Sequence, residues 1–143
     1  MGGEESGGIG FRGHIPERDG LYCGIKLIRL FQETGKGPEA LIEEIEARYG
    51  RSCYRRVDRR LSVEEAAQAK NRLQKGQKDH IGTKKVDHVD GTDGIKFLFG
   101  DEAWLLIRAS GTEPLLRFYA EGPDEKTVQE LLSEGQKLCG LAT

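Results

Sequence analysis

A polar loop between two β-prone runs is the feature that most constrains how this chain folds. Residues 104–107 form an apolar run and residues 115–119 form a second one, separated by the segment Arg108-Ala-Ser-Gly-Thr-Glu-Pro114. Two such runs joined by a glycine-containing segment are typical of neighbouring strands. The pattern therefore predicts a strand–loop–strand unit with an arginine at each shoulder of the loop, Arg108 and Arg117.

The loop carries groups that suit a phosphate. Because neighbouring strands hold the loop, we expect Arg108 and Arg117 to point toward one spot. Ser110 and Thr112 add hydroxyl donors, and Gly111 lets backbone N–H groups approach a ligand without a side chain in the way. Two guanidinium forks, two hydroxyls and an open backbone match a phosphate monoester dianion. We therefore interpret the segment as a phosphate-binding loop.

A hairpin connection with solvated arginines is the alternative, because Ser-Gly-Thr turns are common. Arginines at both shoulders, and Glu113-Pro114 after the turn, go beyond what turn chemistry requires. The residues therefore favour phosphate binding over a plain turn.

The chain opens with a second glycine-rich segment, Gly2-Gly-Glu-Glu-Ser-Gly-Gly8. In an extended segment, residues two apart face the same way, so the Glu4 carboxylate and the Ser6 hydroxyl share one side. Such a pair is suited to two vicinal sugar hydroxyls. A mobile glycine-rich tail is the alternative for this segment taken alone.

Both loops resemble loops of one family. The string from Arg108 to Tyr119 closely resembles the Arg-x-Ser-Gly-Thr-Glu-Pro-x-x-Arg-x-Tyr signature of the α-D-phosphohexomutases, the phosphoglucomutases and phosphomannomutases. In that family the signature is the phosphate-binding loop of the fourth, C-terminal domain. The opening segment is similar to the family's Gly-Glu-x-Ser-Gly sugar-binding loop, which belongs to the third domain. The two loops occur in the family's order.

The resemblance implies a role for each matching residue. Glu4 and Ser6 would bind the sugar, and Glu113 would support the site by orienting an arginine. The substrate phosphate would contact the remaining matches, which are Arg108, Ser110, Gly111, Thr112 and Arg117.

The same resemblance implies the activity of a longer parent enzyme. Such enzymes interconvert hexose 1-phosphate and hexose 6-phosphate, with a phosphoserine in a Ser-His motif, a Mg²⁺ held by alternating aspartates, and a hexose bisphosphate as activator. No histidine of this chain follows a serine, and no Asp-x-Asp-x-Asp occurs. We therefore expect a C-terminal piece that is inactive alone, has no catalytic residue or metal ligand, and works with a phosphosugar and the remaining domains of its polypeptide.

A stand-alone phosphate- or phosphosugar-binding module without catalysis is the alternative function. The identity of the hexose stays open. Glu5 makes the first loop look more like those of glucose and mannose mutases than like the phosphoglucosamine branch, where glutamine commonly follows the first glutamate.

Asp87, Asp90 and Asp93 are spaced by three around two glycines. A calcium site is one interpretation, but the ligand alternation and the closing glutamate of a calcium loop are absent. A polar hairpin turn is the favoured interpretation.

Composition narrows the classes of partner. Hydrophobic residues make up 36% of the chain and charged residues 32%, with a net charge of −2. No apolar run is long enough to span a membrane, and we expect no signal peptide before the glycine segment. Three cysteines without metal-ligand spacing suggest reduced thiols and a cytoplasmic location.

Arginines cluster in residues 48–60, but Asp58 interrupts them, so a solvated strand face is favoured over a nucleic-acid site.

Helix caps and turn residues predict the element order. Asp19, Ser62 with Glu65, and Asp124 are expected to cap three helices, and Pro38 to begin another. The predicted helices cover residues 20–33, 38–49, 62–73 and a final stretch after 124. The predicted strands lie at 51–60, 83–90, 94–99, 103–109 and 115–121.

This order indicates an α+β fold with a mainly antiparallel sheet packed with helices. The resemblance places residues 1–37 in a remnant of the third domain, with the sugar loop and one helix, and residues 38–143 in the C-terminal phosphate-binding domain.

Overall fold

The computed structural model describes residues 1–4, 7–75, 79–110 and 113–141 of the chain. They form two compact units, Met1–Gly50 and Arg51–Thr143. The predicted division at residue 38 differs from this, because helix α2 (Pro38–Tyr49) falls in the first unit. The break before Pro38 only separates two helices, whereas Gly50, with φ of 88°, ends α2 and leads into extended chain.

The first unit contains one small hairpin and two helices. Strand β1 (Gly2–Gly3) pairs antiparallel with β2 (Ile9–Gly10), a pairing that the sequence did not predict. Helix α1 (Gly20–Thr34) begins at Asp19, whose side chain accepts a hydrogen bond from the Tyr22 N–H, and ends at Gly35 in the left-handed conformation. The α2 bounds match the prediction. No residue of either helix is buried in the described structure.

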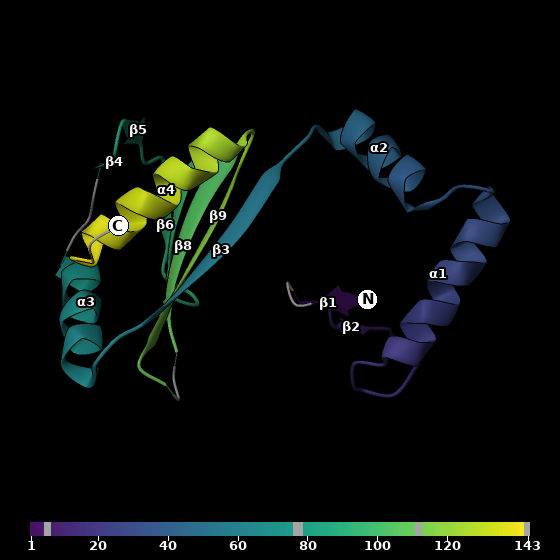
Figure 1. Cartoon of the computed structure of the whole chain (residues 1–143), viewed down its shortest axis with the longest axis horizontal. Helices are drawn as coiled ribbons and strands as arrows, with labels where there is room; N and C mark the ends of the chain where they lie inside the picture. The colour runs from purple at the N-terminus through teal and green to yellow at the C-terminus, as the bar shows by residue number, and fades with distance from the viewer. Residues whose placement is uncertain (5–6, 76–78, 111–112, 142–143) are drawn as a thin grey trace. The chain divides into compact units, whose positions relative to one another are not determined.

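The second unit is built on a five-stranded antiparallel sheet (Figure 1). Its strands lie in the order β3-β9-β8-β7-β6. Their bounds are Cys53–Arg60 for β3, Leu115–Gly122 for β9, Ala103–Ala109 for β8, Ile95–Phe99 for β7 and His88–Asp90 for β6. β6 to β9 follow one another as hairpins, and β3 adds to the outer edge of β9. The predicted α+β class with an antiparallel sheet is confirmed.

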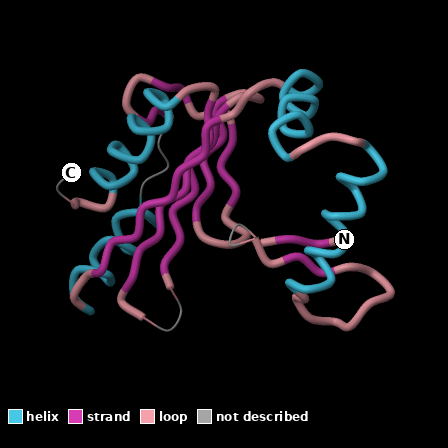
Figure 2. Tube along the Cα trace, turned by 45° about the vertical axis from the view of Figure 1, so that its right-hand side comes forward, coloured by secondary structure: helices cyan, strands magenta, loops and turns pink. Residues whose placement is uncertain are grey.

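Helices α3 (Val63–Lys75) and α4 (Glu125–Leu138) lie on one face of this sheet (Figure 2). Alternation along the strands sends one set of side chains toward the helices and the other set to the opposite face. Gly135 lets α4 approach closely, since a Cβ there would lie 3.0 Å from a methyl of Leu105. The largest fully buried side chains are Phe97, Leu105, Ile107, Leu116, Phe118, Val128, Leu131 and Leu132.

The predicted helix caps of the second unit are present. Ser62 and Glu65 form a reciprocal capping box: the Glu65 N–H donates to Ser62 Oγ at 3.2 Å, and the Ser62 N–H donates to Glu65 Oε2 at 2.8 Å. At α4, Asp124 Oδ1 accepts from the Thr127 N–H at 2.7 Å. These bonds satisfy N–H groups that have no partner inside the helix.

The predicted strand at 83–90 is divided in the structure. β4 (His80–Ile81) pairs with β5 (Lys84–Lys85) as a separate hairpin, and only β6 joins the main sheet. Gly82, with φ of 57°, makes the tight turn between β4 and β5. The β-prone character of the run was visible in the sequence, but the change of partner within it was not. None of the described helices is long and apolar enough to cross a membrane.

Candidate phosphate-binding site

Arg108 and Arg117 lie directly opposite each other. β8 and β9 pair so that Arg108 faces Arg117, one step before the strands part into the loop. Side chains of directly opposed residues share a face, with Cβ atoms about 4.5–5.5 Å apart. The register therefore places both arginines on one face of the sheet, and their convergence on one ligand stays a prediction. Two like charges in this position repel each other, so the arrangement favours an anion between or beside them.

The Arg117 side chain has an unusual environment. Its Nε is buried and has no hydrogen-bond partner among the residues that the structure describes. A buried donor without an acceptor costs about 1–3 kcal/mol. Such a group calls for an explanation, and a ligand oxygen would supply the missing acceptor.

Arg108 has one carboxylate neighbour. Its Nε lies 3.1 Å from Asp93 Oδ1, in a pair that is 43% and 67% exposed. Asp93 belongs to the turn between β6 and β7, as the favoured hairpin-turn interpretation requires. Gly94 brings this turn against β8, because its φ is 93° and a Cβ there would lie only 2.6 Å from the Ile107 carbonyl oxygen.

Backbone hydrogen bonds hold both ends of the loop. The Ser110 N–H donates to the Leu115 carbonyl at 2.8 Å and closes the β8–β9 ladder. The Leu61 N–H donates to the Pro114 carbonyl at 2.9 Å, which ties the loop exit to the end of β3. Ser110 Oγ also accepts from the Glu113 N–H at 3.3 Å. Gly111 and Thr112, both predicted to contact phosphate, lie outside the described residues.

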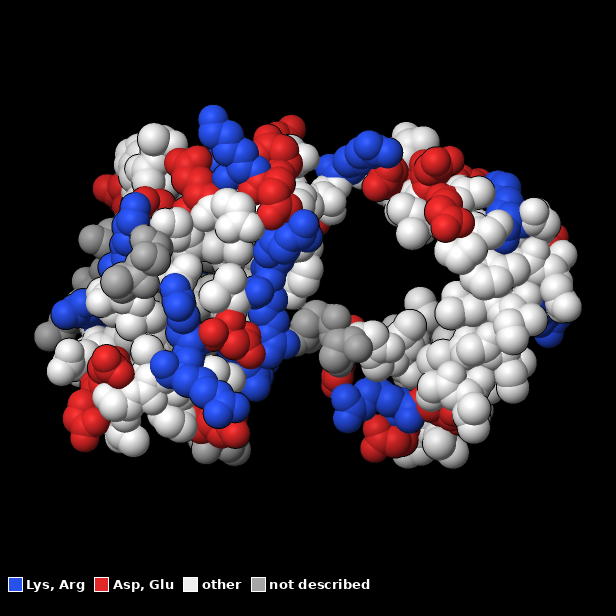
Figure 3. All heavy atoms as spheres, in the orientation of Figure 1, with Lys and Arg blue, Asp and Glu red and all other residues white. Residues whose placement is uncertain are grey.

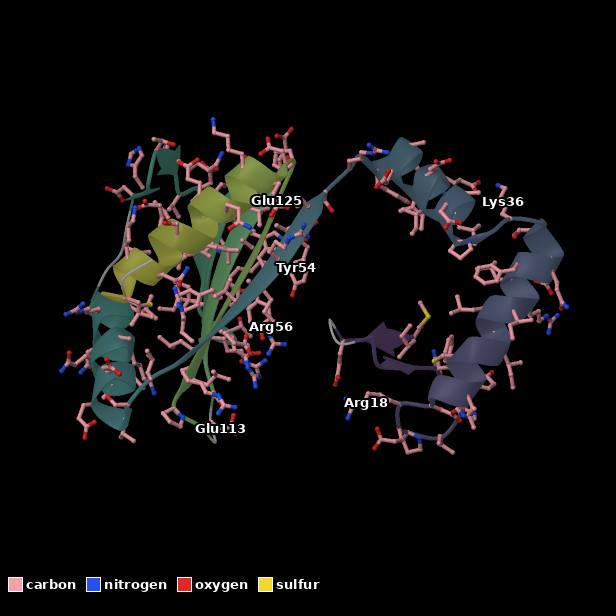
Figure 4. All side chains as sticks on the ribbon, viewed as in Figure 1. Arg18, Lys36, Tyr54, Arg56, Glu113 and Glu125 are labelled. Atoms are coloured by element: carbon pink, nitrogen blue, oxygen red, sulfur yellow. The ribbon has the colours of Figure 1, made fainter. Side chains whose placement is uncertain are left out.

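Glu113, which is predicted to orient an arginine, contributes its backbone to the turn. Within the described part of the chain its carboxylate makes no ion pair with an arginine, and its backbone secures the turn instead. Glu113 lies at the loop end of the sheet, opposite the end that carries Glu125 (Figure 4). A pocket of about 190 Å³ beside the loop is lined by Arg60, Leu61, Glu113, Pro114 and Leu115.

Asp58 and Arg56 of β3 border the site, and the sequence did not identify either residue as part of it. Asp58 pairs in register with Arg117. Its two carboxylate oxygens accept from Arg56 Nε and a terminal nitrogen of Arg56, each at 2.7 Å. This fork, together with the charges of Arg56 and Arg117, holds the pKa of Asp58 below its ordinary value. The spacing Arg56-x-Asp58 predicts that both side chains share one face of a strand. It does not predict that Arg117 lies next to Asp58 on the neighbouring strand.

The arginines of β3 do not form one uniform surface. Basic side chains follow the course of β3, with acidic side chains among them (Figure 3). Arg55 lies 2.8 Å from Glu125, and Arg59 Nε donates to Gln136 Oε1 at 2.5 Å, both on α4. Arg55 and Arg59 contact the helix side, while Arg56 lies on the opposite face, so the arginines of β3 are divided between the two faces of the strand.

Of the predicted sugar loop, Glu4 follows β1 and Gly7 and Gly8 precede β2. The Glu4 N–H donates to the Gly8 carbonyl at 2.9 Å, and Arg18 lies 2.7 Å from the Glu4 carboxylate. Ser6, its predicted partner in sugar binding, lies outside the described residues, as does Glu5. His14 lies 2.7 Å from Asp19 and stacks on the Tyr22 ring, with the two ring centres 4.1 Å apart.

Among the described residues, no three His, Cys, Asp or Glu side chains come together as a metal site. The three aspartates at 87, 90 and 93 serve different contacts. Asp87 accepts from the Gly100 N–H at 2.5 Å, and Asp90 accepts from the Thr92 N–H at 2.9 Å.

Two family descriptions match the chain. "Phosphoglucomutase/phosphomannomutase, C-terminal domain" matches residues 54–135, and "Phosphoglucomutase/phosphomannomutase, alpha/beta/alpha domain III" matches residues 1–49. The chain belongs to the phosphoglucomutase/phosphomannomutase family. The resemblance of its two loops is confirmed at the level of the family.

Individual relatives agree with the family assignment. A phosphoglucomutase/phosphomannomutase of Thermococcus kodakarensis is 36% identical over 140 residues, which cover 96% of this chain and 28% of the relative. A phosphoglucosamine mutase of Brevibacillus brevis is 27% identical over 133 residues, which cover 93% of this chain and 25% of the relative. The chain thus spans little more than a quarter of the length of these mutases.

A solved structure supports the fold. The phosphoglucomutase/phosphomannomutase family protein from Burkholderia thailandensis matches with a TM-score of 0.64 at 20% identity, over 96% of this chain and 28% of that protein.

Proposed function

We propose that this chain supplies the substrate-binding loops of a phosphohexomutase that interconverts hexose 1-phosphate and hexose 6-phosphate. Arg108, Arg117 and the loop between them bind the substrate phosphate, and Glu4 with Ser6 binds sugar hydroxyls. The family membership supports the reaction class. The names of the relatives include both glucose/mannose and glucosamine mutases, so the proposal extends to the hexose phosphates as a class.

One observation carries the phosphate assignment. Arg117 stands opposite Arg108, and its buried Nε has no acceptor among the described residues. A phosphate oxygen satisfies that donor and offsets the repulsion of the two arginines at once. A carboxylate satisfies the same donor with fewer oxygens and less charge, so a phosphate dianion matches the two forks better.

In the proposed mechanism this chain positions the substrate. The arginine forks grip the phosphate that is not being transferred, and the Glu4 carboxylate accepts from sugar hydroxyls. Together these contacts orient the hexose so that its other end is presented for phosphoryl transfer. Binding energy is thereby used to position the reacting group. Mg²⁺, a phosphoserine and a hexose bisphosphate activator would belong to the reaction of the proposed parent enzyme.

Phosphate titration followed by NMR tests the assignment. Inorganic phosphate and glucose 6-phosphate are expected to shift the Ser110 amide and the Arg117 side chain, with a Kd on the order of millimolar because a single open anion site gains little beyond its ordering cost. Arg117→Ala should weaken binding more than Arg56→Ala. Arg117→Lys should recover only part of the affinity, because lysine has the charge without the fork.

Shifts confined to amides of residues 55–60, with Ser110 unmoved, would show that the phosphate-loop assignment is wrong. Arg55→Ala is the matched control, since it removes one positive charge from the helix side of the sheet.

A turnover assay separates the mutase part from the alternative of an independent binding module. The isolated chain should not convert glucose 1-phosphate in the presence of Mg²⁺ and a hexose bisphosphate, because the sequence has neither the Ser-His motif nor the aspartate loop. Restored turnover on mixing with the first three domains of a relative would support the mutase role. Turnover by the isolated chain above a blank would contradict the proposed division of labour.

A further inference from the structure

Arg117 lies opposite the Asp58 carboxylate but forms no ion pair with it in the described structure. Asp58 stands directly across from Arg117 on β3, at the usual separation for a cross-strand ion pair. Opposite charges in this position ordinarily pair. Yet among the described residues no ion pair joins Asp58 to Arg117, and the buried Nε of Arg117 has no acceptor.

The reason lies two residues away on the same strand face. Arg56 occupies both oxygens of Asp58 through two contacts of 2.7 Å. Residues two apart in a strand share a face, so Arg56 reaches Asp58 without distorting the strand. A two-point guanidinium–carboxylate fork is stronger and more directional than a single contact, so it competes well for Asp58.

The Arg56 side chain is itself held in place by an aromatic ring. Its guanidinium carbon lies 5.4 Å from the centre of the Tyr119 ring, and Tyr119 is 5% exposed. Tyr119 is the cross-strand partner of Arg56, just as Arg117 is that of Asp58. These four residues are neighbours on one face of the sheet. The Tyr119 ring supports the Arg56 guanidinium, and the Arg56 fork holds the Asp58 carboxylate.

We propose that Arg56 withholds Asp58 from Arg117 and thereby keeps the Arg117 guanidinium available to the substrate phosphate. This inference rests on the proposed phosphate site and assigns positioning roles to Arg56 and Asp58. Asp58 balances the charge of the arginines when the site is empty, and the fork stops it from competing with the phosphate.

Four variants of the full chain test the inference through inorganic phosphate affinity. Arg56→Ala frees Asp58 to pair with Arg117 and should weaken binding by about threefold to tenfold. Arg56→Lys keeps the charge but loses the fork, and should also weaken binding. Asp58→Asn removes the competitor and should not weaken binding, and the double change Arg56→Ala with Asp58→Asn should restore the affinity that Arg56→Ala loses.

The controls separate this role from simple charge and from stability. Arg55→Ala makes the same charge change beside Arg56 but on the helix face, and should leave the affinity within about twofold of the original. If Arg56 acts only by its charge, Arg56→Lys binds phosphate like the original chain, and the inference is overturned. A fall in thermal stability that parallels the loss of affinity would likewise assign Arg56 a structural role and overturn it.

A measurement without phosphate distinguishes this inference from the phosphate assignment. Pairing with Asp58 should move the Arg117 Nε–H resonance downfield in ligand-free Arg56→Ala, and Asp58→Asn should reverse the movement. If the original chain shows no phosphate-dependent shift at Ser110, the phosphate site fails, whatever the Arg117 resonance does. If phosphate binds there but the Arg117 resonance ignores Arg56→Ala, the site stands and the withholding role is overturned.

Discussion

Helices α1 and α4 are alike in sequence pattern and unlike in surroundings. Each is about four turns long, begins at an aspartate cap and carries an apolar stripe. On α4 the stripe is buried, with Val128, Leu131 and Leu132 at most 2% exposed. On α1, Leu21 is 85% exposed and Ile25 is 65% exposed.

The difference lies in what each unit offers as a partner. The second unit has a five-stranded sheet whose inner face receives α4, whereas the described part of the first unit has, besides its helices, only a hairpin of two two-residue strands. Caps and stripes are local properties, so they predict a helix equally well in both places. Burial of a helix requires a second surface, such as the sheet that α4 covers. The four predictions below compare the two units with and without such a surface.

The largest contrast should come from truncating one apolar side chain in each unit. Phe118→Ala removes a fully buried ring from the interior strand β9 and should lower the free energy of unfolding by about 3–5 kcal/mol. Ile25→Ala removes exposed surface from α1 and should change stability by less than about 0.5 kcal/mol. Fluorescence of Trp104, the sole tryptophan, follows the second unit in urea, and α1 amide signals follow the first.

An unchanged Trp104 transition in Phe118→Ala would mean that the sheet and α4 do not share a core. A large effect of Ile25→Ala would mean that α1 is covered in solution.

Two glycines with similar backbone angles sharpen the same contrast. Gly13 has φ of 86° with nothing within 4 Å of a built Cβ, while Gly94 has φ of 93° with the Ile107 carbonyl 2.6 Å away. Gly13→Ala should cost only the left-handed strain of about 1–2 kcal/mol. Gly94→Ala adds a steric clash and should cost about 2–4 kcal/mol in all. Equal losses in the two urea titrations would contradict this account.

The sequence predicted the strand–loop–strand unit, the helix starts and the antiparallel class because these depend on alternation, capping and turn residues close together in the chain. It also predicted that Arg108 and Arg117 stand at the two shoulders of one short loop, and the two residues pair across β8 and β9. It did not reveal Asp58 beside Arg117, because β3 and β9 are more than fifty residues apart and their register depends on the packed sheet.

The change of partner between β5 and β6 was missed for a related reason. Both segments are β-prone, and nothing local distinguishes a strand that joins the main sheet from one that forms a separate hairpin. The predicted domain boundary at residue 38 and the boundary between the two compact units at Gly50 both follow helix breaks, which are equally strong in the sequence, and only contacts in space rank them.

The two units should also differ in which ligand reports on them. Arg117→Ala should weaken inorganic phosphate binding on the order of tenfold, because a charge-assisted fork is lost. Glu4→Ala should leave inorganic phosphate affinity unchanged, since its proposed partners are sugar hydroxyls. NMR titration with phosphate and then glucose 6-phosphate measures both. If Glu4→Ala weakens inorganic phosphate binding as much as Arg117→Ala does, the proposed roles are not divided between the units in this way.

The smallest expected effect concerns the two aspartate caps under acid. The Thr127 N–H lowers the pKa of Asp124, and the Tyr22 N–H, followed by His14, lowers that of Asp19. A carboxylate whose folded pKa is depressed stabilises the fold above its unfolded pKa, and this contribution is lost as pH falls through the folded pKa. The stability difference between the original chain and Asp124→Asn should therefore narrow between about pH 5 and about pH 3.

Trp104 fluorescence in urea should detect this change for Asp124, because α4 unfolds with the sheet that it covers. The equivalent change in Asp19→Asn should appear only as altered protection of α1 amides, with the Trp104 transition unaffected. A stability difference for Asp124→Asn that is the same at both pH values would show that the side chain caps α4 without its charge. A Trp104 response to Asp19→Asn would instead show that the two units unfold together, and the contrast between α1 and α4 would then be one of exposure alone.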